Sequence, residues 1–233
     1  VKEVRMNFPA IMGYGPFLLL GLVYTIAVSV AAALLGLAFG ILGCAGRLSG
    51  NRFWRRLASA YVVVFQSLPE LLVVLAVYFS GDSLLKSITG QGRIGINPFL
   101  AGTFALALAM GAYATDILRS AYLQVPNGLR EASDALGLKR WQSLLLVDAP
   151  QVFRLALPPL GNLFLVVQKN SALVSVIGLS EILRQAQVAA GATHDPLSFY
   201  LAAGALYLLL AAATMLIQQN MESRLARGME SRR

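Results

Sequence analysis

The sequence predicts an all-α membrane protein, a single transmembrane domain of residues 1–233 with five membrane-spanning helices. Hydrophobic residues make up 57% of the chain and charged residues only 13%, a composition well outside that of soluble domains. A helix needs about 20 mostly apolar residues to cross a bilayer. Five apolar runs of that kind alternate with polar segments along the chain.

The predicted spans cover residues 17–46, 57–79, 98–123, 155–177 and 197–217. Residues 1–16 end in Gly-Tyr-Gly-Pro, a turn-prone sequence that predicts a lead-in rather than part of the first span. Pro69 lies in the middle of the second span, where we expect a kink in one helix rather than a complete break. A glycine-rich linker through Gly95 follows that span.

Capping signals predict two of the later helix starts. Asn97 followed by Pro98 predicts the start of the third span, and Asp195 followed by Pro196 predicts the start of the fifth. The fourth apolar run is interrupted by polar residues 168–171, and residues 180–195 connect it to the fifth.

Lysine and arginine predict the orientation of the chain. Four of the 19 lie in the first loop, five lie in or beside the central polar loop and four lie in the C-terminal tail, giving 13 on one side against 5 on the other, with Lys169 inside a predicted span as the remaining one. Because cytoplasmic loops carry the excess of cations, we expect a periplasmic N-terminus and a cytoplasmic C-terminus. These cations form short clusters between apolar runs, so nucleic acid is not an expected partner.

The sequence lacks the residue patterns that nucleotide binding, hydrolytic catalysis and zinc binding require. The sequence has no phosphate-binding G-x-x-x-x-G-K-[ST] loop and no H-E-x-x-H or G-x-S-x-G motif. The single histidine, His194, falls in a connecting segment, and the single cysteine, Cys44, lies in an apolar run, which rules out an internal disulfide and a zinc ligand set. We therefore expect no enzyme activity, no metal site and no cofactor bound by this chain.

Residues 125–153 form a polar loop that predicts two short amphipathic helices. Asn127 is the expected cap of the first helix, Gly137 its end, and residues 141–147 the second helix. Such a pair either lies on lipid headgroups or docks into a groove of a partner, and periodicity alone leaves both open. The first helix has a predicted apolar face of Leu129, Ala132, Ala135 and Leu136.

Three ionisable residues fall inside predicted spans: Glu70, Asp116 and Lys169. A charge there costs a few kcal/mol unless it faces protein or water. The three residues therefore predict either contact with a solute or a buried pairing of Lys169 with one of the carboxylates, and the sequence leaves both open. Polar side chains around Lys169 complete the predicted solute path: Asn170, Ser171 and Ser175, with Gln168 beside them.

The central loop resembles the EAA loop of ABC importer permeases, whose pattern is E-A-A-x3-G-x9-I-x-L-P. Glu131, Ala132, Gly137 and Pro150 match it at the correct spacing, whereas the usual Ala, Ile and Leu are replaced by Ser133, Val147 and Ala149. Blocks at residues 112–119, 125–128 and 169–177 are similar to those of the polar amino acid permeases, most of all the histidine, lysine/arginine/ornithine and opine permeases. Residues 66–69 and Asn170 depart from that pattern.

The resemblance implies a type I ABC importer permease in the bacterial inner membrane. It implies a subunit that passes a polar amino acid, of basic type, or an opine, from periplasm to cytoplasm by alternating access. The implied partners are two ATP-binding cassette subunits that hold ATP and Mg²⁺, a second related permease or a second copy of this chain, a periplasmic solute-binding protein and the lipid bilayer. The implied coupling residues of the loop are Arg130, Glu131, Ala132, Ser133, Leu136 and Gly137.

Two other functions fit parts of the sequence. An ion-coupled secondary amino acid transporter could use the charges at residues 70, 116 and 169, but such carriers need internal repeats or more spans than are visible here. A membrane scaffold that binds a peripheral enzyme would need only the polar loop.

Overall fold

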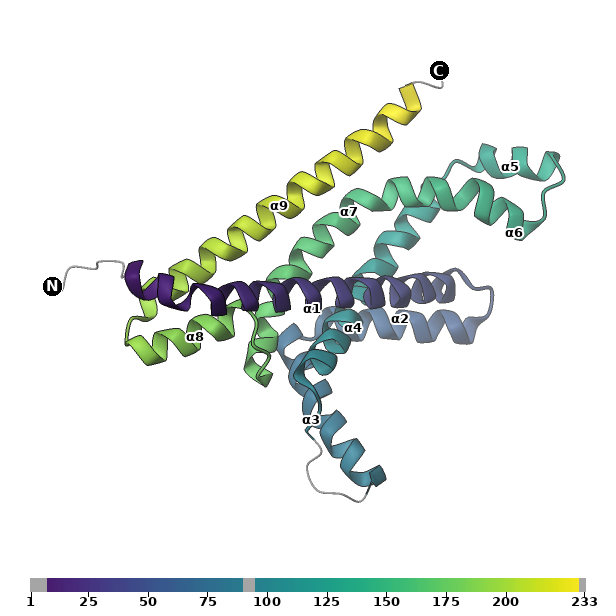
Figure 1. The fold of residues 1–233 in the computed structure, drawn as a ribbon. Helices are drawn as coiled ribbons and strands as arrows, with labels where there is room; N and C mark the ends of the chain where they lie inside the picture. The colour runs from purple at the N-terminus through teal and green to yellow at the C-terminus, as the bar shows by residue number, and fades with distance from the viewer. Residues whose placement is uncertain (1–7, 90–94, 231–233) are drawn as a thin grey trace.

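The computed structural model describes residues 8–89 and 95–230, and these ranges are helical apart from short connections (Figure 1). In chain order the elements are α1 (Phe8–Leu48), α2 (Arg52–Ser67), α3 (Glu70–Thr89), α4 (Pro98–Leu123), α5 (Asn127–Ala135), α6 (Arg140–Ser143), the π-helical turn η1 (Leu144–Asp148), α7 (Ala149–Asn170), the 3₁₀ helix η2 (Ser171–Ile177), α8 (Ile182–Thr193) and α9 (Pro196–Glu230).

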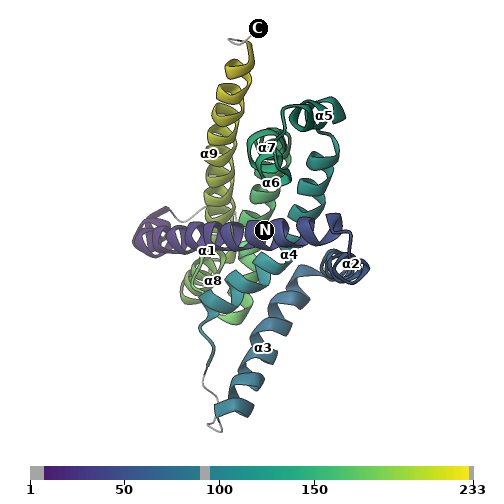
Figure 2. The same cartoon turned by 90° about the vertical axis from the view of Figure 1, so that its right-hand side faces the viewer.

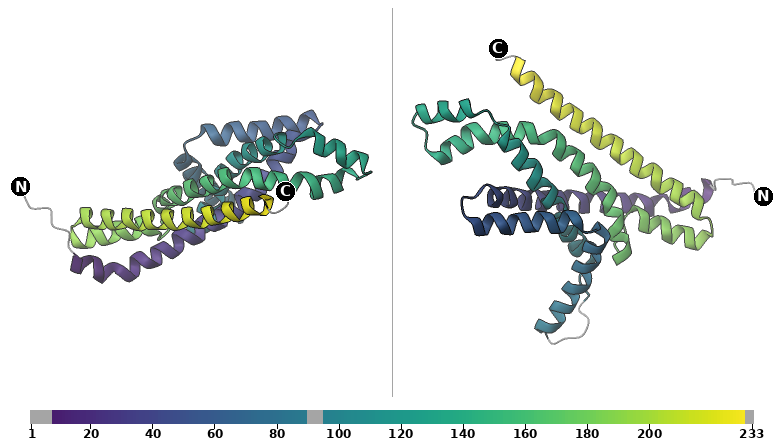
Figure 3. Two further views of the ribbon diagram at one scale, coloured as in Figure 1. Left: turned by 90° about the horizontal axis from the view of Figure 1, so that it is seen from above. Right: turned by 180° about the vertical axis from the view of Figure 1, so that it is seen from behind.

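The predicted all-α fold with five spans is confirmed. Four helical stretches of the described ranges are long and apolar enough to cross a membrane, and the bent pair of α2 and α3 makes a fifth if it counts as one span. The α5–α6 hairpin lies at one end of the molecule and α8 at the other, as Figure 3 also shows. Helix α3 points away from the remaining helices (Figure 2).

Helices α1 and α4 pack side by side through small residues at the centre of the structure. The close approach is strictest at Gly43, where an added Cβ would lie 2.1 Å from the hydroxyl oxygen of Thr115. Val28, Leu106 and Val174 belong to the apolar core to which α1, α4 and η2 contribute. Many apolar side chains point outward instead, Leu34 and Leu208 among them, as expected for helices that face lipid.

The second predicted span is broken rather than kinked, so the expected kink at Pro69 was wrong. Helices α2 and α3 meet at an angle of 109°. Leu68 is extended, with ψ of 138°, because the ring of a following proline disfavours the helical conformation. Helix α2 therefore ends at Ser67, and Glu70 begins a new helix.

Three predicted helix ends fall short of the observed ones. Helix α1 begins at Phe8 and passes through Pro16, so the expected lead-in is helical from residue 8, while residues 1–7 lie outside the described ranges. Helix α3 continues to Thr89 through the predicted linker, and α9 continues to Glu230. Glycine and proline are weaker helix breakers in membrane proteins, since lipid offers the freed backbone groups no water.

The fourth apolar run belongs to a helical stretch that starts at Arg140, fifteen residues before the predicted boundary. The stretch passes through η1 into α7, and the wider π turn ends at Asp148, two residues before Pro150, whose nitrogen cannot donate a helical hydrogen bond. After Asn170 it tightens into η2, which ends at Gly178 in the left-handed region, with φ of 96°.

The predicted caps at Asn97 and Asp195 are confirmed. The side chain of Asn97 accepts a hydrogen bond of 2.8 Å from the Phe99 nitrogen, and α4 has the predicted bounds. Asp195 accepts a hydrogen bond of 3.3 Å from the Ser198 nitrogen, and α9 begins at Pro196. The predicted connection of residues 180–195 contains helix α8.

Candidate functional site

The polar loop forms a helical hairpin of α5 and α6 at one end of the molecule. Helix α5 starts one residue earlier than expected, because Pro126 occupies the cap position and Asn127 is already helical, with no side-chain cap bond. Gly137 ends the hairpin's first helix as predicted, with φ of 72°. The nitrogens of Gly137 and Leu138 donate to the carbonyl oxygens of Asp134 and Ser133 at 2.9 and 3.1 Å, the Schellman pattern.

One face of α5 is open to the surroundings. Glu131 and Ala132 are exposed, and Leu136 at the end of the helix keeps 79% of its surface accessible. Apolar side chains that project at the tip of a polar hairpin are typical of a surface that binds a partner. Four of the six expected coupling residues lie on this accessible side: Glu131, Ala132, Leu136 and Gly137.

The other two expected coupling residues face the protein. Arg130 donates to Asp148 at 3.0 Å, and Ser133 shares a hydrogen bond of 2.7 Å with Ser143. Neither Asp148 nor Ser143 was predicted from the sequence. A carboxylate next to the apolar run 144–147 is the signal that could have found Asp148.

A second polar group is half-buried beside the helical core, where two helix discontinuities meet. Glu70 is the first residue after the α2–α3 break, and Asn170 is the last residue of α7 before η2. The Asn170 amide donates a hydrogen bond to Oε2 of Glu70. The pair borders a cavity of about 10 Å³, room for a single water at most. The cavity is also lined by Leu106, Ala109, Met110, Tyr113, Leu163, Val166 and Val167.

Asp116 lies further along α4 and has different partners. It forms an ion pair with Arg47 at the end of α1, and Nε2 of Gln66 donates to its other oxygen at 3.0 Å. An open cavity of about 270 Å³ adjoins it. The remaining lining residues are Ile117, Ser120, Ala121, Gln124, Leu155 and Pro159.

The two cavities lie along the same pair of helices. On α4 their linings follow one another from Leu106 to Gln124 at helical spacings of three and four, and on α7 from Leu155 to Asn170. Residues at these spacings share one face of a helix. One stripe of α4 and one stripe of α7 therefore face both cavities.

Lys169 is exposed and, within the described ranges, forms no ion pair with either carboxylate. Glu70 and Asp116 are bonded to Asn170 and Arg47 instead, so the expected alternative of a buried pairing of Lys169 is absent from this conformation. Ser171 is buried and donates to its own helix, at 2.7 Å from the Gln168 carbonyl oxygen.

The hydroxyl of Ser175 is buried and has no hydrogen-bond partner in the part of the chain that the structure describes. The structure therefore brings Glu70 and Asn170 together, whereas among the described residues Asp116 and Lys169 form no hydrogen bond or ion pair with that pair.

Glu181 is a buried acid that was not predicted from the sequence. It caps α8 by accepting hydrogen bonds of 2.9 and 2.8 Å from the nitrogens of Leu183 and Arg184. The hydroxyl of Tyr207 on α9 donates to the same carboxylate at 2.5 Å. These bonds fix α8 against α9 at the end of the molecule opposite α5.

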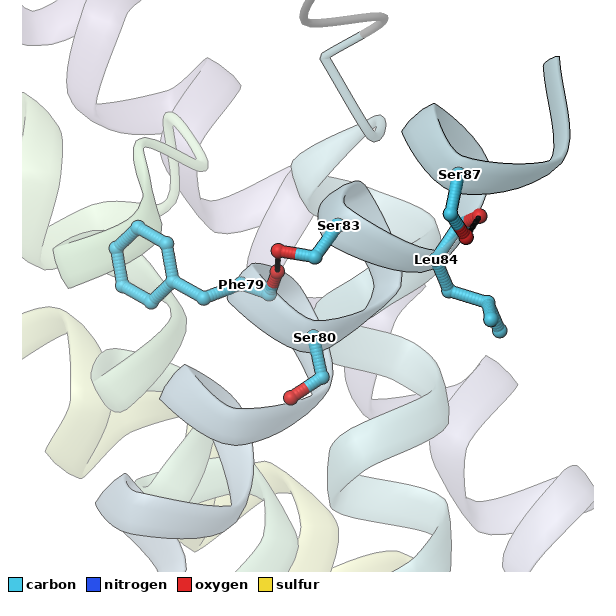
Figure 4. Close-up of a pocket in the computed structure, with 5 residues that line it drawn as sticks. All are labelled: Phe79, Ser80, Ser83, Leu84 and Ser87. Carbon is cyan, nitrogen blue, oxygen red and sulfur yellow. Dashed lines mark hydrogen bonds between the residues drawn. The ribbon is translucent and has the colours of Figure 1, made fainter. Parts of the chain in front are cut away.

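An open depression of about 490 Å³ on α3 does not have the features of a binding site. Its lining comes from this one helix (Figure 4). The hydroxyls of Ser83 and Ser87 donate back to the carbonyl oxygens of Phe79 and Leu84 at 3.0 and 2.8 Å, so these donors serve the helix itself.

Broken helices that meet at a polar pair in a membrane bundle, together with a polar hairpin at one end, are features of membrane transport proteins. The chain belongs to the family of binding-protein-dependent transport system inner membrane components, whose sequence pattern matches residues 32–227. It is thus a transmembrane permease component of that class of transporter.

Named relatives and solved structures agree with this family. The chain is 38% identical to the octopine transport system permease protein OccQ of Rhizobium radiobacter over 97% of this chain and 99% of that protein. It is 30% identical to the histidine/lysine/arginine/ornithine transport system permease protein HisQ of Escherichia coli, over 94% and 97%. A crystal structure of an amino acid ABC transporter with histidines superposes with a TM-score of 0.83 at 29% identity, covering 95% of this chain and 100% of that one. Nothing in these relatives supports the ion-coupled carrier.

Proposed function

We propose that the chain is the membrane-spanning subunit of an ATP-driven importer that moves a polar amino acid, of basic type, or an opine from periplasm to cytoplasm. Movement occurs by alternating access, and ATP is hydrolysed in separate subunits. The names of the relatives support the solute class, because octopine, nopaline, arginine and the histidine/lysine/arginine/ornithine group occur among them.

The observation that carries this proposal is the outward face of α5. A short helix with exposed apolar residues and an exposed Glu131 suits insertion into a groove of a partner protein. The partner is an ATP-binding cassette subunit, and two of them are expected per transporter. ATP and Mg²⁺ bind there and not to this chain, which has no phosphate-binding loop.

A single chain of this size supplies half of the translocation path. The exposed apolar faces and the projecting α3 suit a second permease, either a related subunit or another copy of this chain. A periplasmic solute-binding protein delivers the solute at the end of the molecule opposite α5.

The solute path follows the stripe that α4 and α7 share. Glu70 and Asp116 attract the cationic group of the solute, and Lys169 attracts its carboxylate. Asn170, Ser171 and Ser175 supply hydrogen-bonding groups beside them. In the conformation described, the cavity at Glu70 is too small for an amino acid, which fits a closed step of the transport cycle.

The protein lies in the bacterial inner membrane with its N-terminus in the periplasm and its C-terminus in the cytoplasm. The cation clusters support this threading, because the α1–α2 turn, the α5–α6 hairpin and the C-terminal end of α9 lie toward one side of the molecule in Figure 1, away from its N-terminal end.

Co-purification tests the docking role of α5. The wild-type permease, expressed with its binding-cassette subunit and tagged on the permease, is expected to retain that subunit in detergent. A Glu131→Lys variant reverses the charge on the exposed face and is expected to lose it while inserting normally into the membrane. Equal retention by the variant and the wild type would contradict α5 as the docking surface.

A further inference from the structure

The side chain of Arg130 joins α5 to two other parts of the protein. Its Nε donates to Oδ1 of Asp148 at 3.0 Å, and its Nη2 donates to the carbonyl oxygen of Tyr122, near the end of α4, at 2.9 Å. The guanidinium carbon also lies 4.3 Å from the centre of the Tyr122 ring, in the range of a cation–π attraction. One side chain thus connects α5 with the end of α4 and the start of the α7 stretch.

Asp148 is buried although it follows a run of accessible leucines. Only 4% of its surface is exposed, whereas Leu145 and Leu146 in the same π-helical turn are 59% and 67% exposed. A buried carboxylate needs a charged or hydrogen-bonding partner, and Arg130 provides it. The turn therefore orients its one acidic side chain toward α5.

A second contact ties the same helix to the same stretch. The hydroxyls of Ser133 on α5 and Ser143 on α6 lie 2.7 Å apart and both residues are buried. Arg130 and Ser133 are three residues apart and share the inward face of α5. Glu131 and Ala132 lie between them in sequence and face outward.

The helices held by these contacts are the ones that line both cavities. Tyr122 lies at the end of α4, which carries Asp116, and Asp148 directly precedes α7, which carries Asn170. When α5 moves, the adjoining ends of α4 and α7 therefore move with it, as long as the contacts of Arg130 are kept.

We propose that Asp148 is a positioning residue of the transport cycle. Its ion pair with Arg130 makes α5 move as one body with the adjoining ends of α4 and α7, so that movement of the docked ATPase reaches the solute path. Without the pair, α5 shifts against these helices and hydrolysis proceeds with little import. This inference rests on the proposed function, because it requires α5 to be the ATPase contact.

The test uses the complete transporter, with its binding-cassette subunits and solute-binding protein, in proteoliposomes. Asp148→Asn removes the charge and keeps the size of the side chain. We expect unchanged co-purification of the ATPase subunit and at least half of the wild-type hydrolysis rate, with about a tenfold fall in solute imported per ATP, a change of the size seen along coupling networks. Asp148→Glu is expected to recover part of the ratio. Asp82→Asn, a matched change on α3 that keeps an acceptor for the Gly95 nitrogen, is expected to leave the ratio unchanged.

A disulfide between α5 and α6 tests whether Asp148→Asn acts by loosening α5 or by a general loss of folding. Ser133→Cys with Ser143→Cys, in a Cys44→Ala background, can form a disulfide because the two hydroxyls are already close and an S–S bond is about 2.05 Å long. Combined with Asp148→Asn, the oxidised pair is expected to restore the import-to-ATP ratio at least threefold over the reduced pair.

Three outcomes would overturn the inference: a wild-type ratio in Asp148→Asn, loss of hydrolysis in step with import, or no recovery on oxidation. Failure of the proposed function gives a different result. In that case the wild-type transporter itself does not retain the ATPase subunit or does not import with ATP.

Discussion

Asn170 donates a hydrogen bond to Glu70 across 100 residues of sequence, at the point where two interrupted helices meet. Glu70 opens α3 after the break at Pro69, and Asn170 closes α7 before the backbone tightens into η2. Interrupted helices free backbone groups for hydrogen bonding, which is why transporters place solute sites beside them. This relationship makes the Glu70 region the centre of the proposed solute path.

Because Asn170 and Glu70 are hydrogen-bonded, we expect substitutions at the two residues to have coupled effects on uptake. Asn170→Asp replaces a hydrogen-bond donor with a second acidic group beside Glu70, and we expect uptake to fall by about tenfold, since a bond to a charged group contributes roughly 1.5–3 kcal/mol. Glu70→Gln in the same chain removes the repulsion. Uptake kinetics of the two single variants and the double variant check this: additive losses would contradict a direct interaction.

We expect Asp116 to affect the solute selectivity of the transporter rather than the stability of its fold. Its side chain is 43% exposed and that of Arg47 23%, so the ion pair contributes at most about 1 kcal/mol to folding. Asp116→Asn is therefore expected to leave the melting temperature within a few degrees of wild type. Its KM for a basic amino acid or opine is expected to rise about tenfold, with a smaller change for a neutral amino acid that the transporter accepts. Equal losses for both solutes would argue against contact with the cationic group.

Replacing Lys169 distinguishes a subunit that conducts a solute from a scaffold that only anchors a partner. Its side chain is exposed, and its ammonium group contacts neither Glu70 nor Asp116, so Lys169→Ala should not disturb folding. We expect a fall of about fivefold in solute-stimulated ATP hydrolysis, because one exposed ammonium–carboxylate contact contributes at most about 1 kcal/mol. Unchanged stimulation and uptake would favour a role in which the chain only anchors a partner.

We expect a packing defect between α1 and α4 when Gly43 is replaced by alanine. An alanine there places its Cβ 2.1 Å from the Thr115 hydroxyl oxygen, whereas an alanine at Gly13 in the same helix meets nothing within 4 Å. Gly43→Ala should therefore lower the free energy of unfolding by about 1–3 kcal/mol, and Gly13→Ala should have little effect. Thermal unfolding of the purified variants measures the difference, and similar melting temperatures would contradict the close contact of α1 and α4.

Local signals in the sequence predicted the elements whose ends depend on nearby residues. Asn97 and Pro98 define the start of α4, and Gly137 ends the α5 hairpin helix by its left-handed conformation, so both were predicted correctly. Pro69 was harder, because a proline within an apolar run is compatible with a kink or with a break. The packing of α3 away from α2 decides between them.

Contacts between distant residues could not be predicted in this way. Arg130 and Glu131 are neighbours in sequence, yet one faces Asp148 and the other faces outward, because only the folded hairpin defines an inside. The same holds for Asp116, whose partner Arg47 is 69 residues away. Sequence spacing indicated which charges lie in the membrane region, and the fold determines which of them meet.

We expect this permease to import a solute only when separate subunits hydrolyse ATP. Proteoliposomes that contain the permease with its binding-cassette subunits, with binding protein added outside and ATP enclosed, test it in the absence of any ion gradient. If import is driven by ATP hydrolysis, a basic amino acid or opine accumulates in the vesicles, and accumulation stops when ATP is replaced by a non-hydrolysable analogue. Accumulation that continues without hydrolysis and follows an imposed proton or sodium gradient would contradict it.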